Sequence, residues 1–234
     1  MTEIDFEQLG LEELQELLDH ANPQIRSDAI CSLGDRLRLK SLSALPREII
    51  EQLAKLLGDD SFLVQLESAI TLAEIQDHRG TFVLMEAVRR KDFRLDALRA
   101  LGQMQDPMAI ALLQNWMEKR FAPWADRMQA AAALAELGIP TAYDYLEKKL
   151  SSRKKAERAA AIHFLGATKH PAASEHLLRI VKETHDPHRD CAARALGLLG
   201  NVEILPELEQ LLSQTVGDLN QDIRVSIHSL QNSL

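Results

Sequence analysis

Apolar residues recur along the chain at spacings of three and four, with polar and charged residues between them. This spacing is typical of a helix with one buried face. Leucine, alanine, glutamate and arginine, which are good helix formers, dominate the sequence. The clearest stripes are Leu14, Leu17 and Leu18; Leu53, Leu56 and Leu57; Leu112, Leu113 and Trp116; Leu146 and Leu150; Leu177, Leu178 and Val181; and Leu208, Leu211 and Leu212. The pattern predicts an all-α protein.

A second kind of helix repeats a short pattern downstream of these stripes. Counted from a starting residue, an arginine lies at +1, a small residue at +4, an apolar residue at +8 and a glycine or alanine at +9. The +1 positions are Arg26, Gln65, Arg94, Arg127, Arg158, Arg189 and Arg224, separated by 39, 29, 33, 31, 31 and 35 residues. The last copy is irregular, because its next leucine, Leu230, comes one place early. A period near 31 predicts about seven units, each with helix A, a turn and helix B.

Turn residues mark the start of helix B in several units. Asn22-Pro23 and Asp186-Pro187 combine a capping side chain with a proline that the first helical turn tolerates. Glycine at +9 allows a close approach to the neighbouring unit. The first step is longer because Asp35 to Arg47 reads as an extended connection. No linker or change in composition divides residues 1–234, so we expect a single repeat domain.

The repeated pattern resembles a known family. Asp186-Pro187-His188-Arg189 to Ala195-Leu196-Gly197 is similar to the D-x-x-V-R-x-x-A-x-x-A-L-G pattern of HEAT-like repeats, in the short form of phycobilisome (PBS) lyase subunits. The resemblance covers nearly the whole chain, and Gln65 departs from it, so we expect the second unit to hold its turn less firmly. It implies a right-handed α-α superhelix, or solenoid, with helix B on the concave wall. Such arrays host many functions, so no activity follows.

In this family the arginine pairs with an acidic group in the turn before helix B. The resemblance therefore implies a structural role for Arg26, Arg94, Arg127, Arg158, Arg189 and Arg224. The candidate acids are Asp19, Asp59 or Asp60, Asp92, Asp126, Asp186, and Asp218 or Asp222. Fork-shaped guanidinium–carboxylate pairs would hold successive turns in register. We favour this interpretation over an arginine ladder that binds phosphate.

Composition narrows the setting. The chain carries 27 basic and 35 acidic residues, a net charge of −8, and two cysteines. No run of about 18 apolar residues occurs, and the first residues lack the pattern of a signal peptide. We therefore expect a cytoplasmic protein with no membrane or nucleic-acid partner. Basic clusters at Arg89-Arg90-Lys91, Lys148-Lys149 and Arg153-Lys154-Lys155 leave a contact with RNA or an acidic protein open.

Catalytic chemistry is poorly represented. His185, His188 and Cys191, with Asp186 and Asp190, have the side chains of a metal site, but we favour a solvated turn without metal. HEAT-like di-iron hydroxylases carry paired His-Glu dipeptides, and only the reversed Glu175-His176 occurs here.

HEAT-like enzymes that excise alkylated bases use an acid with nearby tryptophans. Trp116, Trp124 and Asp126 resemble that set, but we expect Trp116 in the core and Trp124 in a turn. No catalytic triad or phosphate loop is present. We expect no enzyme activity, cofactor or metal.

The expected function is a non-catalytic scaffold or protein–protein interaction module. If helix B lines the concave wall, its positions +2, +3 and +6 face a partner. The predicted binding residues are Leu66, Glu67, Ile70, Leu95, Asp96, Arg99, Met128 and Gln129. A bilin lyase-like chaperone or enzyme and a toxin-neutralising, immunity-like protein remain alternatives. The partner is a protein of unknown identity, and we expect a monomer or weak homodimer.

Overall fold

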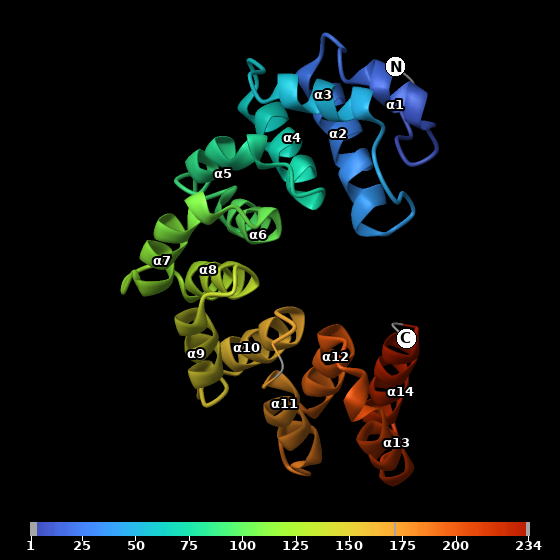
Figure 1. The fold of residues 1–234 in the computed structure, drawn as a ribbon, viewed down its shortest axis with the longest axis vertical. Helices are drawn as coiled ribbons and strands as arrows, with labels where there is room; N and C mark the ends of the chain where they lie inside the picture. Colours follow the sequence, from blue (N-terminus) through green and yellow to red (C-terminus); the bar gives the residue numbers. More distant parts are fainter. Residues whose placement is uncertain (1–3, 171, 233–234) are drawn as a thin grey trace. The chain divides into compact units, whose positions relative to one another are not determined.

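The structure is a computed structural model that describes residues 4–170 and 172–232. Within these residues the chain forms α-helices and short 3-10 turns, and no strand (Figure 1). The predicted all-α repeat architecture is therefore confirmed, while its right-handed sense and the number of units stay predictions. No helix in the described part of the chain is long and apolar enough to cross a bilayer.

Two compact units follow each other, Met1–Ala122 and Pro123–Leu234. The expectation of a single domain over 1–234 stays a prediction. The first unit contains α1 (Leu11–Leu17), α2 (Pro23–Arg38), α3 (Arg47–Leu56), α4 (Phe62–Glu74), η1 (His78–Gly80), α5 (Thr81–Ala87), α6 (Arg94–Met104), η2 (Pro107–Ala109) and α7 (Ile110–Glu118). The second contains α8 (Trp124–Glu136), α9 (Pro140–Lys149), α10 (Lys155–Ala167), α11 (Ala173–Lys182), α12 (Arg189–Leu199), η3 (Val202–Ile204), α13 (Leu205–Gln214) and α14 (Asp218–Gln231).

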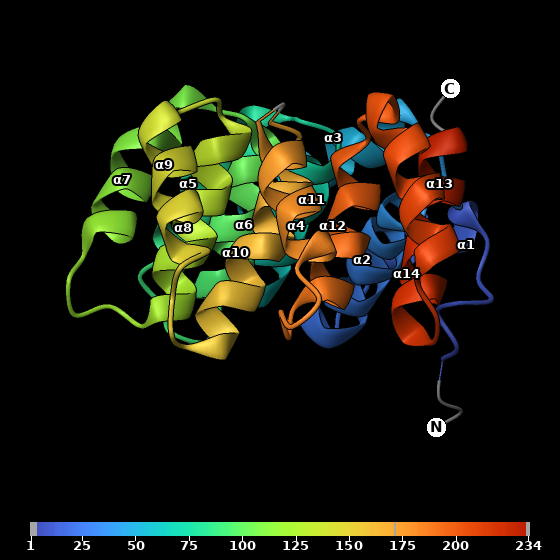
Figure 2. The ribbon, with the colours of Figure 1, turned by 90° about the horizontal axis from the view of Figure 1, so that it is seen from below.

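Each unit has two layers of helices. In the first unit α2, α4 and α6 pack successively against one another, and α1, α3 and α5 pack against their outer side (Figure 1). In the second unit α8, α10, α12 and α14 form the corresponding row, and they lie side by side along their lengths in Figure 2. The expected alternation of helix A and helix B is therefore present in both units.

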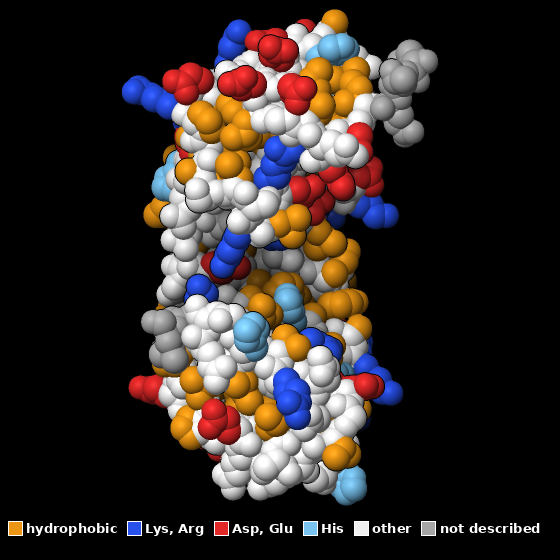
Figure 3. Space-filling model, turned by 90° about the vertical axis from the view of Figure 1, so that its right-hand side faces the viewer, with side chains coloured by type: hydrophobic (Ala, Val, Ile, Leu, Met, Phe, Trp, Pro, Cys, Tyr) orange, Lys and Arg blue, Asp and Glu red, His pale blue; other side chains and the backbone are white. Residues whose placement is uncertain are grey.

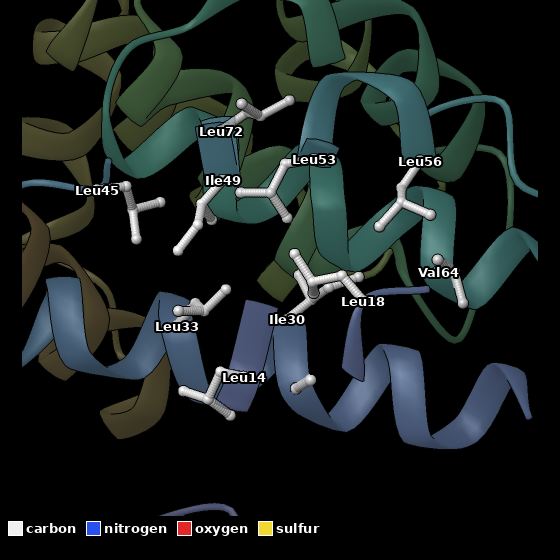
Figure 4. Close-up of a cluster of buried hydrophobic side chains, with 11 residues drawn as sticks. Leu14, Leu18, Ile30, Leu33, Leu45, Ile49, Leu53, Leu56, Val64 and Leu72 are labelled. Atoms are coloured by element: carbon white, nitrogen blue, oxygen red, sulfur yellow. The ribbon is translucent and has the colours of Figure 1, made fainter. Parts of the chain in front are cut away.

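The leucine stripes of the A helices meet the B helices in the core. In Figure 4, Leu14 of α1, Leu18 directly after α1 and Leu53 of α3 point towards Ile30 and Leu33 of α2, and all five are fully buried. Burying a leucine contributes about 1.5–3 kcal/mol. These contacts supply most of the stability that short helices lack when isolated.

Small residues let successive B helices approach closely. A Cβ on Gly166 would lie 2.8 Å from the Cα of Ala195, and one on Gly34 would lie 2.9 Å from the hydroxyl of Thr71. The predicted caps are also present. The Asn22 side chain accepts a hydrogen bond from the Gln24 amide at 2.9 Å at the start of α2. At Gly34 and Gly166, glycine at +9 therefore allows the neighbouring repeat to approach closely.

Candidate functional site

The arginines at +1 tie the start of helix B to the end of helix A. In the second unit, Arg158 Nε donates to the Leu150 carbonyl and Arg189 Nε to the Val181 carbonyl, both at 2.7 Å. The acceptor in each case ends the preceding A helix, where carbonyls have no partner within the helix. Each of these two arginines therefore binds the end of the preceding A helix, and its structural role stays a prediction.

In the first unit the carbonyl that accepts the arginine's hydrogen bond lies six residues before the arginine, compared with eight in the second unit. Arg26 Nη1 donates to the His20 carbonyl at 2.7 Å, and Arg94 Nε donates to the Val88 carbonyl at 2.8 Å. Gln65 Nε2 makes the equivalent bond to the Asp59 carbonyl at 2.5 Å. Gln65 therefore keeps the carbonyl contact, but its amide cannot form an ion pair.

The acidic partners come from the turn of the following repeat. Arg26 Nη2 lies 2.7 Å from Asp59, and Arg158 forms a bidentate pair with Asp186. Asp59 and Asp186 do lie in turns before helix B, as expected, but each binds the arginine of the repeat before it. Each such arginine therefore links three segments: its own helix B, the preceding helix A and the next turn.

These contacts perturb the turn carboxylates. The guanidinium of Arg158 holds the pKa of Asp186 below its ordinary value. Burial opposes the same shift at Asp59, but the hydrogen bond from Arg26 lowers the pKa of that carboxyl overall. Both carboxylates are therefore stabilised in their charged form.

The last repeat corrects the predicted register. Asn220 Nδ2 donates to the Leu212 carbonyl at 2.9 Å, eight residues earlier, as Arg158 and Arg189 do. Arg224 is exposed and donates instead to Asn220 Oδ1 at 2.9 Å. The assignment of Arg224 to the column is therefore wrong by one helical turn. The step from Arg189 to Asn220 is then 31 residues, and the early position of Leu230 no longer needs an explanation.

Arg127 lies on α8, where its guanidinium is 5.5 Å from the centre of the Tyr145 ring. The arrangement agrees with a structural role within the second unit, because Tyr145 belongs to the following A helix, α9.

Three of the predicted binding residues are core residues. Leu66, Ile70 and Met128 are 2%, 5% and 1% exposed. The prediction that they face a partner is wrong, because a B helix packs against an A helix and also against the B helices beside it. Only a narrow strip of each B helix stays accessible, and positions +2 and +6 of α4 fall outside it.

The other predicted residues are accessible. Leu95 is 45% exposed, Asp96 is exposed, and Glu67 and Arg99 are half-buried. Gln129, in the second unit, is also half-buried. Their binding role stays a prediction.

The accessible strip of the first unit is strongly charged. We call it the helix-B face, and it consists of Asp28, Cys31, Asp35, Arg38, Glu67, Glu74, Leu95, Asp96, Arg99 and Gln103 on α2, α4 and α6. Acidic side chains gather over the upper part of Figure 3, which the first unit contributes. Sequence reasoning missed Asp35 and Glu74, although Asp28 and Asp35, like Glu67 and Glu74, are seven residues apart and so lie on one side of their helix.

Glu74 is the best-neutralised carboxylate of this face. It lies 3.2 Å from Arg38 and 3.4 Å from Arg99, and it accepts a hydrogen bond from Gln103 at 3.4 Å. Glu67 is different, because burial and the carboxylates of Asp96 and Asp35 raise its pKa. Burial and Glu67 likewise raise the pKa of the Cys31 thiol. Negative charge is therefore crowded around Glu67.

A groove of about 750 Å³ continues the helix-B face towards the segment that contains Phe6, Glu7 and Leu9. Its walls include Asp28, Asp35 and the side chain of Leu39, which is 79% exposed. Arg36 Nη2 fixes the other wall by donating to the carbonyls of Phe6, Glu7 and Leu9 at 3.3, 3.2 and 2.6 Å. The groove thus combines acidic and apolar walls.

The candidate metal ligands His185, His188 and Cys191 lie in different environments. His188 is 7% exposed, and its Nδ1 lies 2.9 Å from Arg158 Nη1 while Nε2 lies 3.2 Å from the Lys155 carbonyl. His185 is exposed and Cys191 is half-buried. Among the described residues no group of three or more His, Cys, Asp or Glu side chains is placed to hold a metal ion.

The two tryptophans also differ in environment. Trp116 on α7 is 8% exposed, in agreement with the expected core position. Trp124 is 39% exposed and is the first residue of α8, whereas a turn position was expected.

Comparisons with known proteins identify the repeat. The family profile for HEAT repeats matches residues 11–95 and 146–227, more than half of the chain. The profile for the PBS lyase HEAT-like repeat matches residues 93–115 and 126–152. A comparison with curated protein sequences gave no match.

Among the solved structures that resemble this chain, a chain of the phycocyanin lyase complex shows the same fold. The complex of CpcE and CpcF of phycocyanin lyase from Nostoc sp. PCC7120 contains a chain with 18% identity, a TM-score of 0.54 and coverage of 95% of each chain. Human deoxyhypusine hydroxylase shares 18% identity over 97% of each chain, with a TM-score of 0.43. At these identities the likeness to CpcE and CpcF concerns the fold alone. On the profile matches, the chain belongs to the HEAT repeat family.

Proposed function

We propose that this protein is a non-catalytic interaction module that holds a protein partner on the helix-B face of its first unit. The observation that carries the proposal is Leu95, a leucine 45% exposed among the crowded carboxylates of three successive B helices, α2, α4 and α6. Stacked repeats offer such continuous surfaces to extended partners. An exposed apolar side chain with a charged border is the usual composition of a binding surface.

The charges of this face favour a basic partner segment. Burial raises the pKa of Glu67, and repulsion from the nearby carboxylates of Asp96 and Asp35 raises it further. A lysine or arginine from a partner would relieve the repulsion, because opposite charges at close range favour the ionised form. An apolar side chain beside it would cover Leu95.

The groove beside α2 has acidic and apolar walls, like the helix-B face. Asp28, Asp35 and the exposed Leu39 all line this groove. A partner segment that carries alternating basic and apolar side chains would contact both regions. This extension gives the partner enough length of contact for specificity.

Substitution of Leu95 tests the proposal. We expect Leu95→Asp to leave helicity and the melting temperature nearly unchanged, because the side chain is already half in solvent. Affinity capture from native lysate, read by mass spectrometry, should lose the proteins that the wild type retains. Phe82→Asp is the matched control, since Phe82 is 70% exposed on α5, in the other helix layer. The proposal is wrong if both variants capture the same proteins as the wild type.

The likeness to the phycocyanin lyase structure favours one alternative, a lyase-like chaperone or enzyme for bilins. This alternative requires a tetrapyrrole partner. It is supported if purified protein mixed with a linear tetrapyrrole gains red absorption and coelutes with the pigment. It is refuted if the pigment elutes separately at every protein concentration.

A further inference from the structure

Aromatic rings along one edge of the first unit are each covered by a cation. Arg90 lies 3.3 Å from the centre of the Phe62 ring, and Arg94 and Lys119 lie 4.4 and 4.1 Å from the Trp116 ring. Such contacts contribute about 0.5–1 kcal/mol at exposed sites, so they hold the cations in defined positions.

The same edge continues to a highly exposed aromatic residue, Phe121. Phe121, in the turn after α7, is 93% exposed, and the Arg120 guanidinium lies 5.8 Å from its ring centre. Phe62 and Phe93 lie 5.7 Å apart, and Arg94 follows Phe93 directly, so the contacts at Phe62 and at Trp116 belong to one surface. All of these residues lie where α4 and α6 begin and where α7 ends.

Four cations of this edge are exposed and form no ion pair among the described residues: Arg90, Lys91, Lys119 and Arg120. We call these four the cationic rim. In contrast, Arg89 beside them is paired with Glu86 at 2.9 Å. Unpaired cations held over aromatic rings can accept an external carboxylate without first breaking a salt bridge. Arg90, Lys119 and Arg120 already lie against aromatic rings, so less of their side-chain entropy is lost on binding.

We propose that the cationic rim and Phe121 bind an acidic segment of a protein partner. Carboxylates of the segment would pair with the rim cations, and an apolar side chain between them would cover Phe121. Arginine is well suited to this contact, because its planar guanidinium binds carboxylates in a bidentate manner. The rim lies around the starts of α4 and α6 and the end of α7, and its charge is opposite to that of the helix-B face.

The charge pattern favours a protein over a nucleic acid. Two exposed carboxylates lie beside rim cations in the sequence: Asp92 follows Lys91, and Glu118 precedes Lys119. A nucleic acid presents closely and regularly spaced phosphates, which these carboxylates and the net charge of −8 would repel. A protein segment can place its carboxylates opposite the cations alone.

Trp116 provides a direct reporter, because it lies beneath Lys119 and Arg94. The chain has two tryptophans, so Trp124→Phe leaves Trp116 as the sole source of tryptophan fluorescence. The probe is a dodecapeptide that repeats Glu-Glu-Leu-Glu, titrated into this variant at low salt. We expect saturable binding with a change in Trp116 emission, and weaker binding as salt increases.

Matched variants locate the contact. Replacing Lys91, Lys119 and Arg120 with glutamine should weaken probe binding about tenfold. The control replaces Lys40, Arg47 and Lys55 with glutamine, which removes the same charge elsewhere in the first unit and should leave binding within about twofold. Leu95→Asp should bind the probe as the wild type does, so this test and that of the proposed function fail separately.

Three results overturn the proposal: no saturable binding, equal weakening in rim and control variants, or binding without a Trp116 response. A dodecauridylate that binds more tightly than the peptide would also overturn it, in favour of nucleic acid.

Discussion

Arg158 makes the most extensive contacts described for any arginine of the column, and its removal should be costly. Its Nε donates to the Leu150 carbonyl at 2.7 Å, its Nη1 to Asp186 at 2.8 Å, and its Nη2 completes the bidentate pair. The side chains of Arg158 and Asp186 are 18% and 10% exposed. Arg158→Ala would leave a carboxylate with little access to water and without its cation.

The expected magnitude follows from these contacts. Removing one partner of a fully buried ion pair costs about 3–5 kcal/mol. Because this pair is partly exposed and Asp186 keeps its bond from the His188 amide, we expect about 2–3.5 kcal/mol for Arg158→Ala. Arg189 has one such contact, from its Nε to the Val181 carbonyl, so Arg189→Ala should cost about 1 kcal/mol.

Urea unfolding followed by far-ultraviolet circular dichroism measures both costs. A double-mutant cycle of Arg158→Ala with Asp186→Asn then isolates the ion pair, because asparagine can still accept the hydrogen bond that starts α12. We expect a coupling free energy above about 1 kcal/mol. Equal costs for Arg158→Ala and Arg189→Ala, or a coupling near zero, would refute the role assigned to this pair.

Three further predictions concern the repeat. Asn220→Ala should lower the melting temperature more than Arg224→Ala, because only Asn220 binds a helix A carbonyl; equal shifts would restore the original register. Gly166→Ala should destabilise by about 1–3 kcal/mol in urea unfolding, because its Cβ would overlap α12; an unchanged midpoint would contradict that close packing. The pKa values of Asp59 and Asp186 are lower in the folded protein, so these carboxylates stabilise the fold fully above the ordinary pKa of 3.8. This stabilisation is lost as pH falls through the lower folded pKa values, so the difference in melting temperature between Asp186→Asn and the wild type should shrink below about pH 4. A difference that stays constant with pH would contradict this linkage.

The repeat was predictable from sequence because it depends on local and periodic features. Helix formation follows the leucine stripes, and the cap at Asn22 acts on an amide two residues away. The close packing at Gly34 also recurs at the same repeat position at Gly166 and Gly197. Each of these features is readable within one unit, so their agreement across units identified the family fold.

The binding surface was less predictable, because it depends on neighbours that the spacing does not reveal. A helical wheel assumes one buried side, whereas α4 packs against α3 and against both α2 and α6. Leu66 and Ile70 are buried by these additional contacts, while Leu95 lies at the edge of the strip. The correct reading needed the packing of the whole layer.

The register of the last repeat shows what the arginine column requires. In the last repeat, Asn220 makes the helix A carbonyl contact that Arg158 and Arg189 make in theirs, although asparagine has no charge and a shorter side chain. The common requirement is therefore a donor that reaches the end of helix A, and the ion pair with the next turn is an additional contact. Searching for arginine selected Arg224, whereas the 31-residue period selects Asn220. In this protein the period is the more reliable guide, because it is set by the packing of successive helix pairs, while residue type can change wherever another donor fits.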